Sequence, residues 1–146
     1  MGEATFLKVF TDGGARGNPG PAAISVVFLD NKNQILLKRA KTIGWTTNNF
    51  AEYQAFLEAL SLLKDFLKNQ KFKKIKFYSD SQLLVNQILG IYKVKNAQLK
   101  TLYEKAKQEL INLGVDYEVI HVHRHLNSLT DALLNKALDA QKRENS

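Results

Sequence analysis

The order of strand-like and helix-like segments constrains the fold of this chain more than any other feature of its sequence. Three segments rich in β-branched and aromatic residues come first, at 5–12, 22–30 and 34–42. Only a Gly/Pro loop and a polar turn separate them, and connections this short cannot hold a crossover helix. The first three strands are therefore expected to be antiparallel.

The rest of the chain alternates between helical and strand-like patterns. Apolar residues at helical spacing predict a helix that starts near Asn48 or Asn49, with an Asn N-cap, and fades within 68–74. Strands joined through helices pair in parallel with right-handed crossovers, so we expect an α/β fold: a mixed five-stranded sheet flanked by helices. The later predicted elements are a strand at 75–80, helices at 81–89 and 99–113, a strand at 116–122, and a helix at 128–141 followed by a frayed end at 142–146.

Length and composition predict one globular domain over residues 1–146, with a core at about 5–140. The chain has 146 residues, of which 45% are hydrophobic and 24% charged, and such a chain can bury a core without disulfides. It has no cysteine, which excludes thiolate–zinc sites. No apolar run approaches the roughly 18 residues of a membrane span, and the first residues lack a signal pattern. We expect a cytoplasmic monomer with no membrane association.

The charge balance points to a class of partner. Twenty-one Lys and Arg residues against 14 Asp and Glu residues give a net charge of +7. Such a balance favours polyanions through neutralisation of their phosphates. A solvated, lysine-rich surface would explain the same charge, so charge alone leaves both interpretations open.

Four acidic residues stand in four separate patterned contexts: Asp12, Glu52, Asp80 and Asp131. Asp12 and Asp80 each end a predicted strand, where ligands of open α/β sheets collect. Glu52 and Asp131 fall in the first turn of predicted helices. Taken singly, each has an ordinary explanation as a turn former or a partner of the helix dipole. Gathered together, they would repel one another without a cation, so they predict a magnesium site for phosphodiester cleavage.

Other polar motifs have two interpretations each. The Gly-rich segment 13–21 lacks the spacing of phosphate-binding and dinucleotide-binding loops, and a tight strand connection explains most of its glycines. Amide side chains beside Glu52 and Asp80 suit either ribose and base contacts or helix capping. The stretch 92–96 combines Lys with Tyr and suits either a phosphate backbone or a solvated loop.

Three alternating histidines, His121, His123 and His125, would share one face of a strand. A zinc site there is disfavoured, because alternating histidines on edge strands are usually solvated. His123 or His125 could instead lie in a loop before Asp131 and shuttle a proton.

The four acidic residues lie in four motifs: Thr11–Pro21, Thr47–Tyr53, Ser79–Ser81 and Asn127–Leu133. These motifs and their order resemble those of the ribonuclease H type 1 family, and the resemblance extends over residues 5–140. It implies a ribonuclease H-like fold and endonucleolytic cutting of the RNA strand of RNA–DNA hybrids, with 5′-phosphate and 3′-hydroxyl products.

The resemblance also implies site residues and a cofactor. Asp12, Glu52, Asp80 and Asp131 would be catalytic and would hold two divalent ions, Mg²⁺ or Mn²⁺. One ion would activate a water, and the other would stabilise the departing 3′-oxygen. The residues implied for contact with the hybrid are Gly13, Gly14, Ala15, Asn18, Asn48, Gln82 and Arg124.

Two departures from the family pattern suggest its compact, archaeal-type subgroup. Gly90–Asn96 leads directly into a helix, so the basic, Trp-containing protrusion of many bacterial members is absent. The histidine loop is shortened to His123–Leu126, and Arg124 in it fits the compact members. Some of these also cut double-stranded RNA. Alternatives are therefore action mainly on double-stranded RNA, a non-catalytic hybrid-binding domain on the same fold, or a basic α/β scaffold protein.

Overall fold

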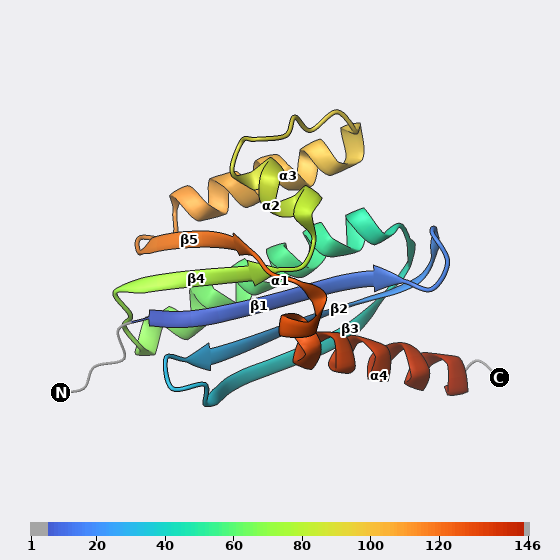
Figure 1. The fold of residues 1–146 in the computed structure, drawn as a ribbon, viewed down its shortest axis with the longest axis horizontal. Coiled ribbons are helices and arrows are strands. Elements are labelled where there is room, and N and C mark those ends of the chain that lie inside the picture. The colour runs from blue at the N-terminus through green and yellow to red at the C-terminus, as the bar shows by residue number, and fades with distance from the viewer. Residues whose placement is uncertain (1–5, 145–146) are drawn as a thin grey trace.

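The computed structural model describes residues 6–144, so predictions for Thr5 and for 145–146 lie outside the described residues. Within that range, strands and helices follow the predicted order (Figure 1). The elements are β1 (Phe6–Ala15), β2 (Gly20–Asp30), β3 (Ile35–Thr46), α1 (Asn48–Asn69), β4 (Lys74–Ser79), α2 (Gln82–Ile88), α3 (Ala97–Ile111), β5 (Asp116–His121), the 3₁₀ helix η1 (Arg124–Asn127) and α4 (Ser128–Glu144).

The five strands form one mixed sheet in the order β3-β2-β1-β4-β5, which confirms the predicted fold class. The pairs β1–β2 and β2–β3 are antiparallel, whereas β1–β4 and β4–β5 are parallel. Strand β1 is therefore the central strand, and its two neighbours run in opposite directions. This arrangement decides where its polar residues lie.

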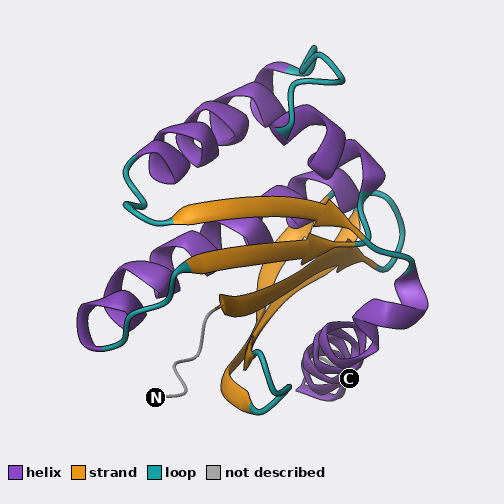
Figure 2. Cartoon of the chain, turned by 60° about the vertical axis from the view of Figure 1, so that its left-hand side comes forward, coloured by secondary structure: helices purple, strands orange, loops and turns teal. Residues whose placement is uncertain are grey.

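Helices cover both faces of the sheet (Figure 2). The long helix α1 packs mainly on β1, with α3 beside it, and α4 packs on the opposite face over β2. The main core lies between α1 and the sheet and includes Tyr53, Phe56, Leu60 and Phe77, each at most 1% exposed. A smaller cluster of Ala23, Leu134 and Leu138 holds α4. Both faces are therefore anchored by apolar burial.

Strand β1 is longer than predicted, so Asp12 does not end it. The strand continues to Ala15 because β2 pairs with it as far as Ala15↔Ala22. The parallel pairing with β4 stops at Thr11↔Ser79. Asp12 is therefore the first residue of β1 beyond its ladder with β4, and Asp80 follows the last residue of β4.

Several other boundaries also differ from those predicted. Strand β3 extends to Thr46, because the β2–β3 ladder continues to Gly20↔Thr46 across a bulge. The N-cap of α1 is Thr47, not Asn, and Thr47 Oγ1 accepts a hydrogen bond from the Phe50 N–H at 3.2 Å. Glu52 is consequently in the second turn of α1. Helix α4 continues through 142–144, where fraying was predicted.

No helix among residues 6–144 combines the length and the apolar character that crossing a bilayer requires.

Candidate metal centre and nucleic-acid interface

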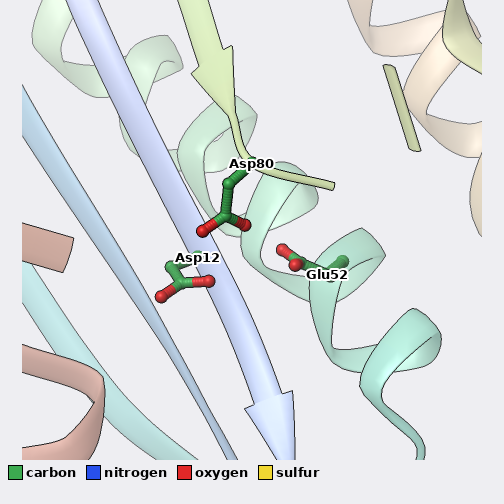
Figure 3. A group of neighbouring side chains, drawn as sticks. All are labelled: Asp12, Glu52 and Asp80. Carbon is green, nitrogen blue, oxygen red and sulfur yellow. The ribbon is translucent and has the colours of Figure 1, made fainter. Parts of the chain in front are cut away.

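Three carboxylates from three different elements converge at one point (Figure 3). Asp12 comes from β1, Glu52 from α1, and Asp80 from the end of β4. One oxygen of each lies within 4.8 Å of an oxygen of the other two, and no other group of three His, Asp or Glu side chains in 6–144 meets this criterion. They line a cavity of about 280 Å³ together with Gly13, Gly14, Arg124 and Asp131. Asp12 and Asp80 therefore lie side by side.

Gly13 fixes the distance between β1 and α1 at this point. Its N–H donates a hydrogen bond to Glu52 Oε1 at 3.0 Å. A Cβ at Gly13 would collide with the backbone carbonyl of Ala51. Only glycine therefore lets the strand approach α1 closely enough to bind the carboxylate of Glu52.

The carboxylate cluster is electrostatically unfavourable by itself. Asp12 is 6% exposed, and burial, followed by repulsion from Asp80 and Asp131, raises the pKa of its carboxyl to about 8. Burial and the charges of Asp12 and Asp80 raise the pKa of Glu52 well above its usual value. The guanidinium of Arg124 opposes both shifts. A divalent cation among these oxygens would remove the repulsion, and such hard oxygen donors are the ones that Mg²⁺ and Mn²⁺ take.

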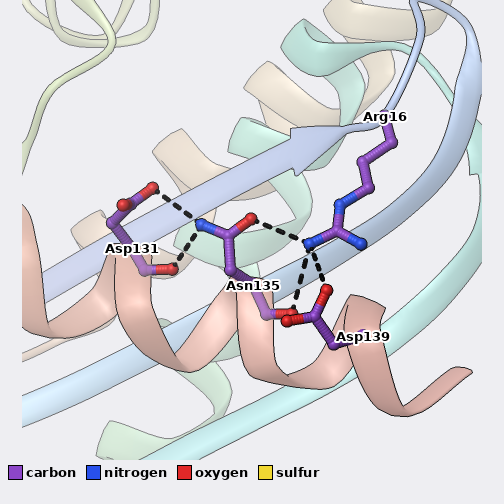
Figure 4. Close-up of polar contacts among 4 residues, drawn as sticks. All are labelled: Arg16, Asp131, Asn135 and Asp139. Carbon is purple, nitrogen blue, oxygen red and sulfur yellow. Dashed lines mark hydrogen bonds and ion pairs between the residues drawn. The ribbon is translucent and has the colours of Figure 1, made fainter. Parts of the chain in front are cut away.

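Asp131 lies in the first turn of α4, as predicted, and lines the same cavity, but it is not part of the tight group of three. Its Oδ1 accepts a hydrogen bond from Asn135 Nδ2 at 3.3 Å. Asn135 Oδ1 in turn accepts one from Arg16 at 3.2 Å, and Arg16 also pairs with Asp139 at 2.8 Å (Figure 4). This chain of contacts links the β1–β2 loop to the carboxylate of Asp131.

The start of α4 is held onto the sheet by buried hydrogen bonds on either side of Asp12. Asn127 Nδ2 donates to the Thr11 carbonyl at 3.0 Å. Ser25, the register partner of Asp12, donates through its Oγ to the Thr130 carbonyl at 2.7 Å. Thr130 Oγ1 donates to the Asn127 carbonyl at 2.8 Å. Neither Ser25 nor Thr130 stands out in the sequence, because the two lie 105 residues apart along the chain.

Some backbone N–H groups of the Gly-rich segment are used in hydrogen bonds within the protein. The N–H groups of Gly13 and Ala15 donate to Glu52 and to Asn48 Oδ1, the latter at 2.8 Å. Asn18 Oδ1 accepts from the Asn48 N–H at 2.9 Å, so it holds the start of α1. The alternative role of helix capping is not that of Asn48, because Thr47 caps α1 and Asn48 Oδ1 instead ties α1 to β1. The amide nitrogens of both side chains are additional donors that a ligand can use.

The remaining predicted contact residues are placed differently. Arg124 lines the cavity from η1, whereas Gln82 is exposed at the first position of α2 and is not among the lining residues. Ser81 caps that helix, since its Oγ accepts from the Leu84 N–H at 3.2 Å. The histidines do not share a strand: His121 ends β5, and His125 lies in η1. All three are exposed, with ring centroids 6.0 Å apart along the row, and the described cavity lining contains none of them.

Comparison with known proteins agrees with this geometry. Residues 10–137 match the family model described as Reverse transcriptase-like. Ribonuclease HI of Halobacterium salinarum is 38% identical over 133 residues, which are 91% of this chain and 64% of that protein. A bifunctional protein of Mycobacterium tuberculosis is 36% identical over 92% of this chain, which spans only 36% of its length.

The crystal structure of LC11-RNase H1 in complex with an RNA/DNA hybrid is similar in fold and in sequence. Its TM-score is 0.87 at 38% identity, and the match covers 92% of this chain and 98% of that one. The strand order, the acidic motifs and these relatives lead to one conclusion: the chain belongs to the ribonuclease H type 1 (ribonuclease HI) family.

Proposed function

We propose that the chain is a metal-dependent endonuclease that hydrolyses the RNA strand of RNA–DNA hybrids and leaves 5′-phosphate and 3′-hydroxyl ends. The observation that carries the proposal is the convergence of Asp12, Glu52 and Asp80 within 4.8 Å in a cavity that Arg124 also lines. Carboxylates packed this closely oppose folding unless they serve a ligand. Family membership and the hybrid bound by LC11-RNase H1 support the choice of substrate.

The donor set would hold two divalent ions, Mg²⁺ or Mn²⁺. Asp12, Glu52 and Asp80 would supply the central ligands, and Asp131 would supply a further oxygen from the rim. Bound ions of this kind lower the pKa of a water nucleophile and neutralise the charge of a departing oxygen. The protein's own contribution is to hold these oxygens in fixed positions through the Gly13–Glu52 hydrogen bond and the docking of α4.

The substrate residues would position the hybrid around this centre. The Arg124 guanidinium suits a phosphate next to the carboxylates, because it is planar and permanently charged. The amides of Asn18, Asn48 and Gln82 suit sugar hydroxyls and base edges. Contact of the segment Gly13–Ala15 with 2′-hydroxyls would distinguish the RNA strand from DNA. Since two of its N–H groups are already bonded, that contact must use other backbone atoms.

Side-by-side cleavage assays with Mg²⁺ test the proposal on a labelled hybrid, a duplex RNA and a duplex DNA of one sequence. We expect cutting of the hybrid's RNA strand, and a decrease on the order of 10³-fold or more for Asp12→Asn or Asp80→Asn. Asp65→Asn is the matched control, because its carboxylate is 85% exposed on α1 and lies outside the cluster.

Each contrary result in these assays has a distinct meaning. Preferred cutting of duplex RNA would mean that duplex RNA is the substrate and that the acidic cluster is still the active site. Hybrid binding without cutting would indicate a non-catalytic domain. Cutting that survives both site variants would place the activity outside the acidic cluster.

A further inference from the structure

A second hollow lies beside the acidic cavity, between the C-terminal half of α4 and the end of β3. Its volume is about 730 Å³. Arg16 and Leu138 line both hollows, so the two are neighbours along α4. We call this hollow the Trp45 groove; its lining residues are Arg16, Pro21, Gly44, Trp45, Leu138, Gln141 and Lys142.

Trp45 is the distinctive residue of the groove. It is the only tryptophan of the chain, and it is 71% exposed although a buried indole would stabilise the fold. The neighbouring Gly44 has φ +90°, and it lines the open groove together with Trp45. An exposed aromatic ring next to open space is a surface on which a planar ligand can stack.

Charge narrows the class of ligand. Arg16 and Lys142 both line the groove, but Asp139 pairs with Arg16 at 2.8 Å and offsets its charge. Lys142 has no ion pair among residues 6–144, so it is the cation that a ligand would meet. An aromatic face combined with a cation is the combination that binds the base and phosphate of single-stranded nucleic acid.

We propose that the Trp45 groove binds an unpaired nucleotide of a strand that extends from the duplex seated at the acidic cavity. The proposal rests on the proposed function for the position of that duplex. A base inside a duplex has both faces covered by its neighbours, whereas an unpaired base offers a free face to the indole. Lys142 would hold the phosphate of the same nucleotide. The shared lining at Arg16 and Leu138 makes the groove continuous with the cavity.

The fluorescence of the chain's single tryptophan reports directly on the groove. The full chain is titrated with a blunt RNA–DNA hybrid and with the same hybrid carrying a three-nucleotide single-stranded extension, with Ca²⁺ replacing Mg²⁺ to slow cleavage. We expect the extended hybrid to quench Trp45 and to bind about five- to tenfold more tightly than the blunt one.

Variants separate stacking from general affinity. By anisotropy of a labelled hybrid, Trp45→Ala is expected to bind both hybrids equally, and Trp45→Phe to retain part of the preference for the extension. Lys142→Gln is expected to weaken the salt dependence of binding to the extended hybrid. Ile111→Ala, an equally exposed apolar residue at the end of α3, is expected to bind as the wild type does.

Equal affinity for the two hybrids with no quenching would overturn the proposal. A spectral shift that depends only on protein concentration would also overturn it, because it would assign the groove to a second copy of the chain. Failure of the proposed function is recognised separately. If Mg²⁺ supports no cleavage of either hybrid while the extension still quenches Trp45, the groove binds nucleic acid and the nuclease assignment is wrong.

Discussion

The backbone N–H of Gly13, the residue after Asp12, donates a hydrogen bond to Glu52 Oε1 at 3.0 Å. This contact joins the central strand to α1 at the point where the carboxylates converge. It places Glu52 beside Asp12 because the absence of a side chain at Gly13 lets the helix backbone approach the strand. The stability of the fold and the geometry of the site therefore depend on the same glycine.

Gly13→Ala is expected to lower the free energy of unfolding by about 2–4 kcal/mol, because the new methyl group must displace the backbone of α1 at Ala51. Urea denaturation measures the change. Gly14→Ala is the matched control: its Cβ would meet its nearest atom, Asn48 Oδ1, at 3.8 Å, which is ordinary contact. Equal stability of the two variants would show that β1 and α1 can separate without cost.

The pH dependence of stability without divalent ions follows from the raised pKa of Asp12. The pKa of the Asp12 carboxyl is about 8 in the folded state, and its ordinary value is 3.8. Between these pH values the folded state therefore binds more protons than the unfolded state. Stability is therefore highest at the acidic end of this range and falls as pH rises, by up to about 1.4 kcal/mol per pH unit for each such group.

Denaturation at several pH values in EDTA measures this slope. Asp12→Asn is expected to reduce it, because Asn cannot ionise and also removes the repulsion on Glu52. A wild-type slope that the substitution leaves unchanged would contradict the assigned cause.

Addition of Mg²⁺ is expected to reverse this loss of stability. Binding to the folded state alone raises the free energy of unfolding by about 2.7 kcal/mol at a hundredfold excess over the dissociation constant. The gain should be larger at pH 8 than at pH 5, because protons compete with the metal for the carboxylates. Thermal unfolding with and without Mg²⁺ measures it. Asp80→Asn should lose most of the gain and Asp65→Asn should keep it; similar gains in both would place the ion elsewhere.

Asn127→Ala is expected to lower the free energy of unfolding by about 1–3 kcal/mol, because it leaves the buried Thr11 carbonyl without its hydrogen-bond donor. It should also loosen η1 and the start of α4, which carry Arg124 and Asp131, and so weaken Mg²⁺ binding measured by calorimetry. Asn69→Ala, at the exposed end of α1, is the control. Loss of stability with unchanged Mg²⁺ affinity would limit Asn127 to a structural role.

Local patterns in the sequence were sufficient for the order and type of the elements. The alternation of apolar residues in β4 and the helical spacing in α1 are properties of neighbouring residues, and these residues keep the same periodicity in the folded chain. The acidic motifs likewise identified the residues that the fold brings to the cavity. The boundaries were less predictable, because β1 ends where its ladder with β2 ends, at Ala15↔Ala22, and not where its own pattern changes.

What the sequence determined by itself was a mixed α/β sheet with its acidic residues close to strand and helix ends. Only the tertiary structure decided that Asp12, Glu52 and Asp80 form the close group while Asp131 stays at the rim. It also decided that Asn127 holds Thr11 across 116 positions and that Arg16 reaches Asp131 through Asn135. The physical reason is range: periodicity is set by adjacent residues, whereas these contacts depend on how distant elements pack against a shared sheet.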